Sequence, residues 1–196
     1  MQVKSCTLLT MTTKKQIYYL SGQGGHLHKG LGEALLARGL DVVGREIQGE
    51  FKTIGFAAQV STIANDLQTQ HWDKDSLVIA NSFGAYLFLH AQAEMAPYIG
   101  RVLLLSPIVG EFGSEELQMG FIPPRAKKLF ELASSKQYPT PTNCQVHVGG
   151  DDWQSNPANV TKLGELLNVP VAIVPNNGHM LDRSYVSGLL DEWLPS

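Results

Sequence analysis

Three polar residue types that together can perform nucleophilic catalysis each follow an apolar stretch of the chain. Ser82 interrupts the apolar segment 77–91, LVIANSFGAYLFLHA, whereas Asp152 and His179 lie in turns that follow two later apolar runs. A serine hydroxyl is a poor nucleophile at neutral pH, so it needs an adjacent base that a carboxylate orients. The order Ser, Asp, His therefore predicts Ser82 as the nucleophile, His179 as the base and Asp152 as the orienting acid.

The sequence around Ser82 indicates a sharp turn between a buried strand and a buried helix. The tetrapeptide Asn-Ser-Phe-Gly separates the two apolar runs and leaves no room for an ordinary loop. A serine in such a turn projects its hydroxyl above the sheet edge, and its flanks must be small, as Ala80 and Gly84 are. The usual pattern has glycine at both flanks, so Ala80 is a departure. A helix N-cap is an equally good interpretation of Ser82 alone, and the later turns favour the nucleophile.

The elements that must position these residues alternate between strands and helices. Six segments are short, apolar and bounded by polar residues, which predicts buried strands at 16–21, 41–47, 77–80, 101–105, 145–148 and 171–174. Apolar residues at helical spacing lie between them, and the segment 48–55 is predicted to be a loop. Such alternation predicts a mostly parallel sheet of about six strands with helices on both faces. Ligands bind such sheets outside the carboxyl ends of the strands, where Ser82, Asp152, His179 and Gln23 fall.

The alternation breaks between residues 109 and 143, where glycines and prolines are frequent. Apolar residues keep helical spacing over 122–133, and we expect the whole segment to form a small cap region over one end of the sheet. Its apolar residues either cover the site or pack over the sheet edge; these are Phe112, Met119, Phe121 and Ile122. A cover this short would leave an open site that favours small or medium acyl groups.

Bulk properties restrict the class of protein. At 196 residues the chain suits a single domain, 1–196. A formal net charge of -3 provides no basic surface for nucleic acid, and no apolar run of 18 residues predicts a membrane span. The two cysteines, Cys6 and Cys144, form no CxxC pair, which favours a reducing, cytoplasmic location. Residues 1–13 are weakly patterned and suit a frayed edge strand or a loose arm, and the oligomeric state is not indicated.

Three short motifs together resemble those of the α/β-hydrolase family of serine esterases and lipases. They are Ala-Asn-Ser-Phe-Gly around Ser82, Gly-Gly-Asp-Asp-Trp around Asp152 and Asn-Gly-His-Met around His179. The resemblance extends over residues 16–193 and implies the three-layer α/β-hydrolase fold. In the family's strand-Gly-x-x-Asp turn the acid is three residues after the first glycine, which implies Asp152. A slip of one residue in the turn would make Asp151 the acid instead.

The same resemblance implies an oxyanion hole made of two backbone N–H groups. One is that of Phe83, the residue after the nucleophile, and the other comes from the loop after the first strand. Leu-Ser-Gly-Gln at 20–23 resembles the family's apolar-His-Gly-x sequence, which implies the N–H of Gln23, with Gly24 as the alternative. Serine replaces the usual histidine there.

Competing motifs fit the glycine-rich segment after the first strand less well. A dinucleotide fingerprint would need a third glycine where Leu27 stands, and a phosphate-binding loop would need lysine where Leu31 stands. His26 and His28 lack an accompanying carboxylate cluster, so they suit the start of a helix better than a metal site, and His26 alternatively lines the pocket. We therefore expect no cofactor and no metal.

The predicted function is that of a serine hydrolase acting on an ester or related acyl bond of a small molecule, in the manner of a carboxylesterase. Two alternatives remain at this point. A non-catalytic binding protein can keep the same scaffold, because a fold does not dictate a function. An acyltransferase can use the same three residues with an acceptor other than water. All three triad residue types are present, and a pure binding protein would not need them.

Overall fold

The computed structural model describes residues 14–116 and 118–195. Within these ranges, six strands form one sheet in the order β2-β1-β3-β4-β7-β8, and every neighbouring pair is parallel. The prediction for residues 1–13 lies outside the described residues. The strands are β1 (Gln16–Gln23), β2 (Asp41–Ile47), β3 (Leu77–Asn81), β4 (Arg101–Leu105), β7 (Asn143–Gly149) and β8 (Val171–Val174), which confirms all six predicted strands.

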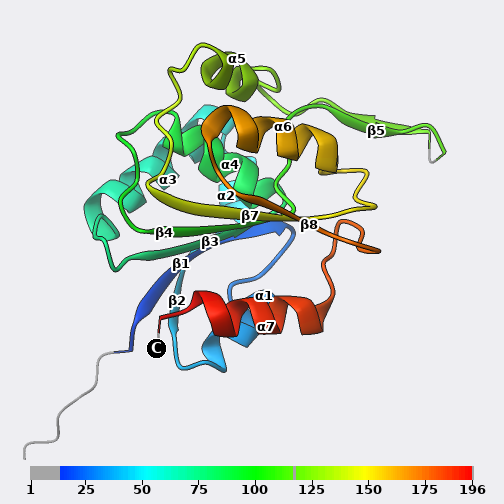
Figure 1. Ribbon diagram of the computed structural model, residues 1–196. Helices are drawn as coiled ribbons and strands as arrows, with labels where there is room; N and C mark the ends of the chain where they lie inside the picture. The colour runs from blue at the N-terminus through cyan, green and yellow to red at the C-terminus, as the bar shows by residue number, and fades with distance from the viewer. Residues whose placement is uncertain (1–13, 117, 196) are drawn as a thin grey trace, which may run out of the picture.

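Helices cover both faces of the sheet (Figure 1). One face carries α1 (Leu31–Leu36) and α7 (Arg183–Trp193); the other carries α2 (Gly49–Thr53), α3 (Phe56–Gln70), α4 (Phe83–Gln92), α5 (Lys128–Ser134) and α6 (Pro157–Leu167). Successive side chains of a strand point to opposite faces, so Ile17 and Tyr19 join one apolar core while Tyr18 and Leu20 join the other. The three-layer arrangement predicted from the sequence is therefore confirmed.

The prediction of a loop over 48–55 is wrong, because α2 forms a short helix there. The Gln59 side chain donates a 2.7 Å hydrogen bond to the Phe51 carbonyl, and the Phe51 ring packs against the core. The Arg45 guanidinium also lies 5.8 Å from the centre of the Phe51 ring. These tertiary contacts stabilise a turn that is too short and too polar to show helical periodicity in the sequence.

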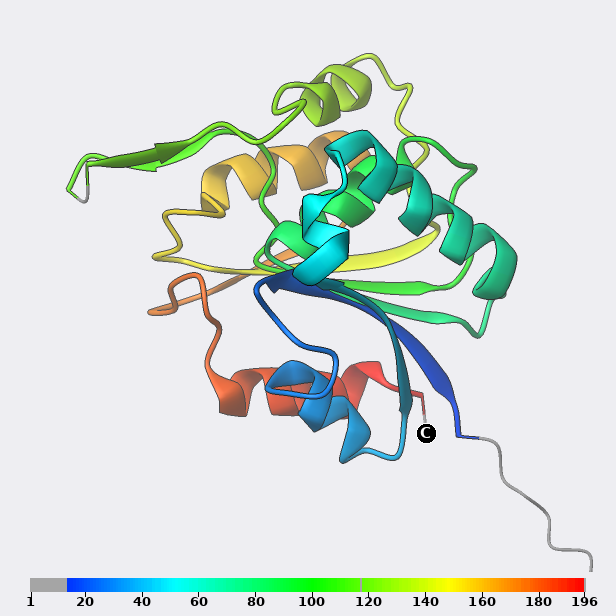
Figure 2. The ribbon, with the colours of Figure 1, turned by 180° about the vertical axis from the view of Figure 1, so that it is seen from behind.

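The segment between β4 and β7 forms a two-stranded arm and a helix. Strands β5 (Phe112–Ser114) and β6 (Met119–Phe121) pair antiparallel, and both views show them extending away from the body of the molecule (Figures 1 and 2). Met119, Phe121 and Ile122 are 60%, 43% and 72% exposed, so they do not pack over the sheet edge. Phe112 is half-buried, with its ring centre 5.8 Å from that of Trp153. No helix in the described part of the chain is both long and apolar enough to cross a membrane.

Candidate active site

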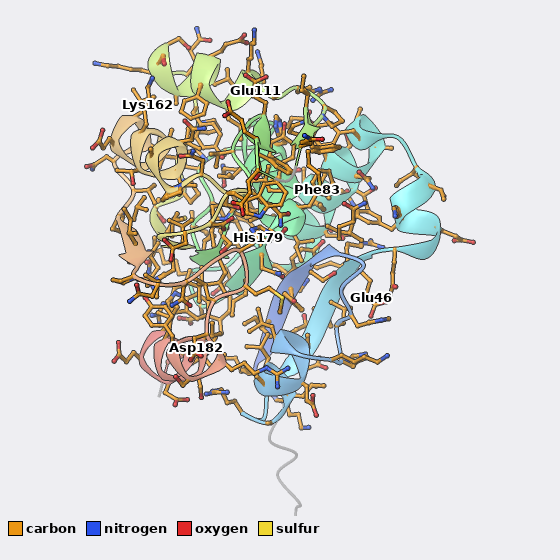
Figure 3. The ribbon with its side chains drawn as sticks, turned by 90° about the vertical axis from the view of Figure 1, so that its right-hand side faces the viewer. Glu46, Phe83, Glu111, Lys162, His179 and Asp182 are labelled. Carbon is orange, nitrogen blue, oxygen red and sulfur yellow. The ribbon has the colours of Figure 1, made fainter. Side chains whose placement is uncertain are left out.

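The carboxyl ends of three strands bring the predicted triad together. Because β3, β7 and β8 are parallel members of one sheet, the turns after them lie along the same edge. Ser82 follows β3, Asp152 follows β7 by three residues, and His179 follows β8 by five. Figure 3 looks toward this edge, where His179 lies near Phe83 at the start of α4.

The Ser82 hydroxyl faces the histidine and does not cap the helix. Its Oγ lies 2.8 Å from Nε2 of His179, and its side chain makes no capping hydrogen bond to α4. The Ser82 backbone has φ 53° and ψ −123°, a conformation that L-residues rarely adopt. Such strain is typical of functional sites and needs support from the surrounding structure. Part of that support is the Ser82 N–H, which donates a 2.9 Å hydrogen bond to the Leu105 carbonyl of β4.

Gly84 allows the start of α4 to approach β1 closely. A Cβ atom at this position would lie 2.3 Å from the carbonyl oxygen of Ser21 and 2.5 Å from that of Leu20. Any side chain would therefore push the helix away from the strand. Ala80, the departure from the usual flanking glycine, is fully buried in the core, and its methyl group is accommodated there.

Asp152 rather than Asp151 contacts the histidine. The Asp152 carboxylate oxygens lie 3.0 and 3.1 Å from Nδ1 of His179, and the Asp152 side chain is fully buried. Its Oδ1 also accepts hydrogen bonds from the N–H groups of Gln154 and Ser155, at 2.9 and 2.8 Å. The Asp151 side chain is exposed, so the alternative that the sequence left open places no carboxylate at the histidine.

Backbone hydrogen bonds join the turn that carries Asp152 to the turn that carries His179. The Asp151 N–H donates a 2.8 Å hydrogen bond to the Asn177 carbonyl, and the Gly150 N–H donates one of the same length to Val174. Gly149 is required at this contact, since a Cβ there would lie 2.2 Å from the Asn177 carbonyl oxygen. Asp152 and His179 are thus held at a fixed separation before any substrate binds.

Ser155 is a site residue that the sequence reasoning missed. Its buried hydroxyl donates a 2.6 Å hydrogen bond to the Ser106 carbonyl and lies 3.4 Å from Nδ1 of His179. Ser106 follows β4 and has a positive φ of 43°, so this hydrogen bond supports a strained residue beside the site. The sequence carries no signal for Ser155, because its hydroxyl binds a backbone carbonyl of a distant segment.

The predicted oxyanion donors belong to two elements next to Ser82. Phe83 is the first residue of α4, and Gln23 is the last residue of β1, the strand next to β3. The Gly24 N–H already donates a 3.1 Å hydrogen bond to the Ile47 carbonyl, whereas the Gln23 N–H is not engaged in that hydrogen bond, so Gln23 stays the predicted donor.

The two histidines of the following loop do not gather metal ligands around them. His26 Nδ1 lies 2.8 Å from Nε2 of Gln48 and 3.6 Å from Oε2 of Glu46, while His28 is exposed. Across residues 14–116 and 118–195, His, Cys, Asp and Glu side chains form no group of three or more that could hold a metal ion.

Comparison with solved structures identifies the fold. The ydeN gene product from B. subtilis matches with a TM-score of 0.64 at 16% identity, over 92% of this chain and 98% of that one. MGS-MChE2, an α/β-hydrolase enzyme from the metagenome of Mar Chica lagoon sediments, matches with 0.60 at 16% identity, over 92% and 90%. A structure from a study of Nitrososphaera gargenis carboxylesterases matches with 0.60 at 12% identity, over 91% and 89%. Neither a family model nor a curated protein matches the sequence. The chain therefore has the α/β-hydrolase fold, as its motifs predicted.

Proposed function

We propose that the protein is a serine hydrolase that cleaves an ester or related acyl bond of a small molecule through an acyl-enzyme. One observation carries the proposal: the Ser82 hydroxyl, the His179 ring and the buried Asp152 carboxylate form a continuous hydrogen-bonded chain of 2.8 and 3.0 Å contacts. Such a chain is the requirement for serine activation. The solved structures with a similar fold include one from a study of carboxylesterases, which favours an ester over other acyl bonds.

In the first half-reaction, Ser82 Oγ attacks the acyl carbon while its proton passes to Nε2 of His179. The Asp152 carboxylate holds the tautomer with the proton on Nδ1, leaves Nε2 free to accept, and stabilises the imidazolium that forms. The N–H groups of Gln23 and Phe83 stabilise the oxyanion, and each such donor typically contributes about 3–4 kcal/mol in the transition state. When the intermediate collapses, Nε2 returns the proton to the leaving oxygen and the acyl group remains on Ser82.

In the second half-reaction, water attacks the acyl-enzyme in the place of the leaving group. His179 takes a proton from that water, the same two donors hold the second oxyanion, and the carboxylic acid leaves as Ser82 regains its proton. No step needs a cofactor. The preference for small or medium acyl groups, the cytoplasmic location and a single-domain organisation remain predictions.

The test is covalent labelling combined with turnover. Wild-type protein is expected to react with a fluorophosphonate at Ser82 and to hydrolyse short-chain nitrophenyl esters. Ser82→Ala should lose both activities while keeping its fold, because residual catalysis without the nucleophile is weaker by several orders of magnitude. Ser134→Ala, an exposed serine on α5, is the matched control and should react as the wild type does.

Different outcomes distinguish the alternatives. Labelling at a serine other than Ser82, or an inert wild type that still binds acyl ligands, would contradict the proposal and indicate a binding protein. Products that carry the acyl group on an added alcohol, formed in preference to the free acid, would indicate an acyltransferase. A series of acyl chains measured in the same assay tests the size preference, and highest activity on long chains would count against an open, small-substrate site.

A further inference from the structure

Gln23 is the last residue of β1 and the loop 24–30 follows it, and side chains from both neighbouring strands contact this stretch of the chain. Residues 24–30 form neither helix nor strand, so individual hydrogen bonds determine where this loop lies. One neighbour is β3, which Ser82 directly follows, and the other is β2 on the opposite side. Asn81 of β3 contacts the end of β1, and Glu46 of β2 contacts the loop itself.

Asn81 makes the contact from the side of the nucleophile. Its Oδ1 accepts a 3.0 Å hydrogen bond from the Gly22 N–H and a 2.9 Å hydrogen bond from the Tyr19 hydroxyl. Asn81 directly precedes Ser82, and Gly22 directly precedes Gln23. A single hydrogen bond therefore connects the residue before the nucleophile with the residue before the oxyanion donor.

Glu46 makes the contact from the other side. Its Oε1 accepts a 2.8 Å hydrogen bond from the Leu27 N–H, and its Oε2 accepts a hydrogen bond from the Gln48 side chain. The Leu27 hydrogen bond lowers the pKa of Glu46, so the carboxylate is charged at neutral pH. Glu46 lies near the carboxyl end of β2, the neighbour of β1 on the side away from β3 (Figure 3).

We propose that Asn81 and Glu46 are positioning residues that set the Gln23 N–H at the oxyanion site before substrate binds. An oxyanion donor contributes to the rate in so far as it already points to where charge will develop, since reorganisation during the reaction would cost part of its benefit. Neither side chain needs to touch the substrate for this role. The inference rests on the proposed function, because it assigns the two residues to that reaction.

Three substitutions and one control test the inference. Asn81→Ala removes the acceptor for Gly22, and Glu46→Ala removes the acceptor for Leu27. Glu46→Gln keeps an oxygen that can accept from Leu27 and should recover most of the loss. Asp41→Ala is the matched control: Asp41 also accepts a side-chain hydrogen bond on β2, from Gln16, but at the opposite end of the strand.

The expected result is a loss of transition-state stabilisation with little change in substrate binding. Removing an oxyanion donor costs about 100- to 1,000-fold, so displacing one should lower kcat and kcat/KM about 10- to 100-fold in the two alanine variants. We expect KM to change less than about threefold, and Glu46→Gln and Asp41→Ala to stay within about threefold of the wild type. Active-site titration with a fluorophosphonate corrects for misfolded protein, which a merely structural role would produce.

A trifluoromethyl ketone supplies a second readout, because it forms a tetrahedral oxyanion on the serine. Its affinity should fall by about the same factor as kcat/KM in each alanine variant. Variants that titrate fully yet keep wild-type kcat/KM and inhibitor affinity would overturn the inference while the proposed function stands. A wild type with no turnover would overturn the proposed function itself. If Asn81→Ala does not fold, the Glu46 pair decides, because the Glu46 side chain is 31% exposed and tolerates truncation.

Discussion

At the scale of single residues, two adjacent aspartates share one chemistry and differ in surroundings. Asp152 is buried against Nδ1 of His179, whereas Asp151 is exposed and contributes its backbone N–H to the neighbouring turn. We expect Asp152→Asn to lower kcat by about 1,000- to 10,000-fold, because an amide can donate to Nδ1 and leave the proton on Nε2. Nε2 of His179 then has no lone pair that could accept the Ser82 proton.

Asp151→Asn is the control for the same chemical change one residue away. It should leave kcat within a few-fold of the wild type, since its carboxylate does not contact His179. Both variants are measured with a short-chain nitrophenyl ester after active-site titration. A large loss in Asp151→Asn with a small one in Asp152→Asn would contradict the assignment of the acid.

The same scale shows which site residues a sequence can and cannot predict. Ser82, Asp152 and His179 were predictable because each follows a recognisable apolar strand, and parallel strands bring such turns to one edge. Asn81 and Ser155 were not, because their partners are backbone groups from distant segments: the Gly22 N–H and the Ser106 carbonyl. No residue type or spacing in the sequence marks which backbone group will lie within hydrogen-bonding distance.

At the scale of elements, two helical glycines provide a matched comparison. A methyl group on Gly84 of α4 would lie 2.3 Å from the Ser21 carbonyl oxygen of β1, whereas one on Gly188 of α7 would have no atom within 4 Å beyond the adjacent residues and backbone of its own helix. Gly84→Ala should lower the free energy of unfolding by about 1–3 kcal/mol through overpacking. Gly188→Ala should raise it by up to about 1 kcal/mol, because alanine favours the helix.

Urea denaturation of the two variants and the wild type measures both changes. Turnover adds a second test of the Gly84 contact, because moving the start of α4 moves Ser82 and the Phe83 N–H with it. We therefore expect Gly84→Ala to lose activity and Gly188→Ala to keep it. Equal effects of the two substitutions on stability would show that the close approach of α4 to β1 is not needed.

The elements that the sequence did not predict lack the apolar runs that mark the parallel strands. The parallel strands are buried on both faces and are therefore apolar throughout, which makes them visible as short apolar runs. Strands β5 and β6 are three residues each, pair through Gly113 and Gly120, and lie on an exposed arm, so they carry neither an apolar run nor an alternating pattern. Helix α5 begins at Lys128, later than its apolar spacing predicts, because proline restricts the residues before Pro123 and Pro124 and Arg125 has a positive φ of 61° that a right-handed helix does not allow.

At the scale of the whole molecule, the larger core buries a titratable group that links global stability to pH. His90 of α4 is 2% exposed, with its ring centre 4.5 Å from that of Tyr86 and 5.1 Å from that of Phe56. Its Nε2 is buried and has no hydrogen-bond partner among the described residues. Burial, with a smaller contribution from the Arg125 charge, lowers the pKa of His90 to about 4. The folded protein therefore keeps this imidazole neutral above about pH 4.

The stability of the protein should consequently fall as the pH is lowered from about 6.5 to 4. An unfolded histidine binds a proton below about pH 6.5, so between that value and the folded pKa the unfolded state holds more protons and acidification favours it. His90 alone should contribute a loss of about 3 kcal/mol by pH 4.

Urea denaturation at a series of pH values measures the dependence of the free energy of unfolding on pH. His90→Leu should make the slope shallower, while His28→Asn, which changes an exposed histidine, should keep the wild-type slope. A wild type whose free energy of unfolding is constant from pH 7 to 4.5, or a His90→Leu variant with an unchanged slope, would show that His90 is not buried in the neutral form.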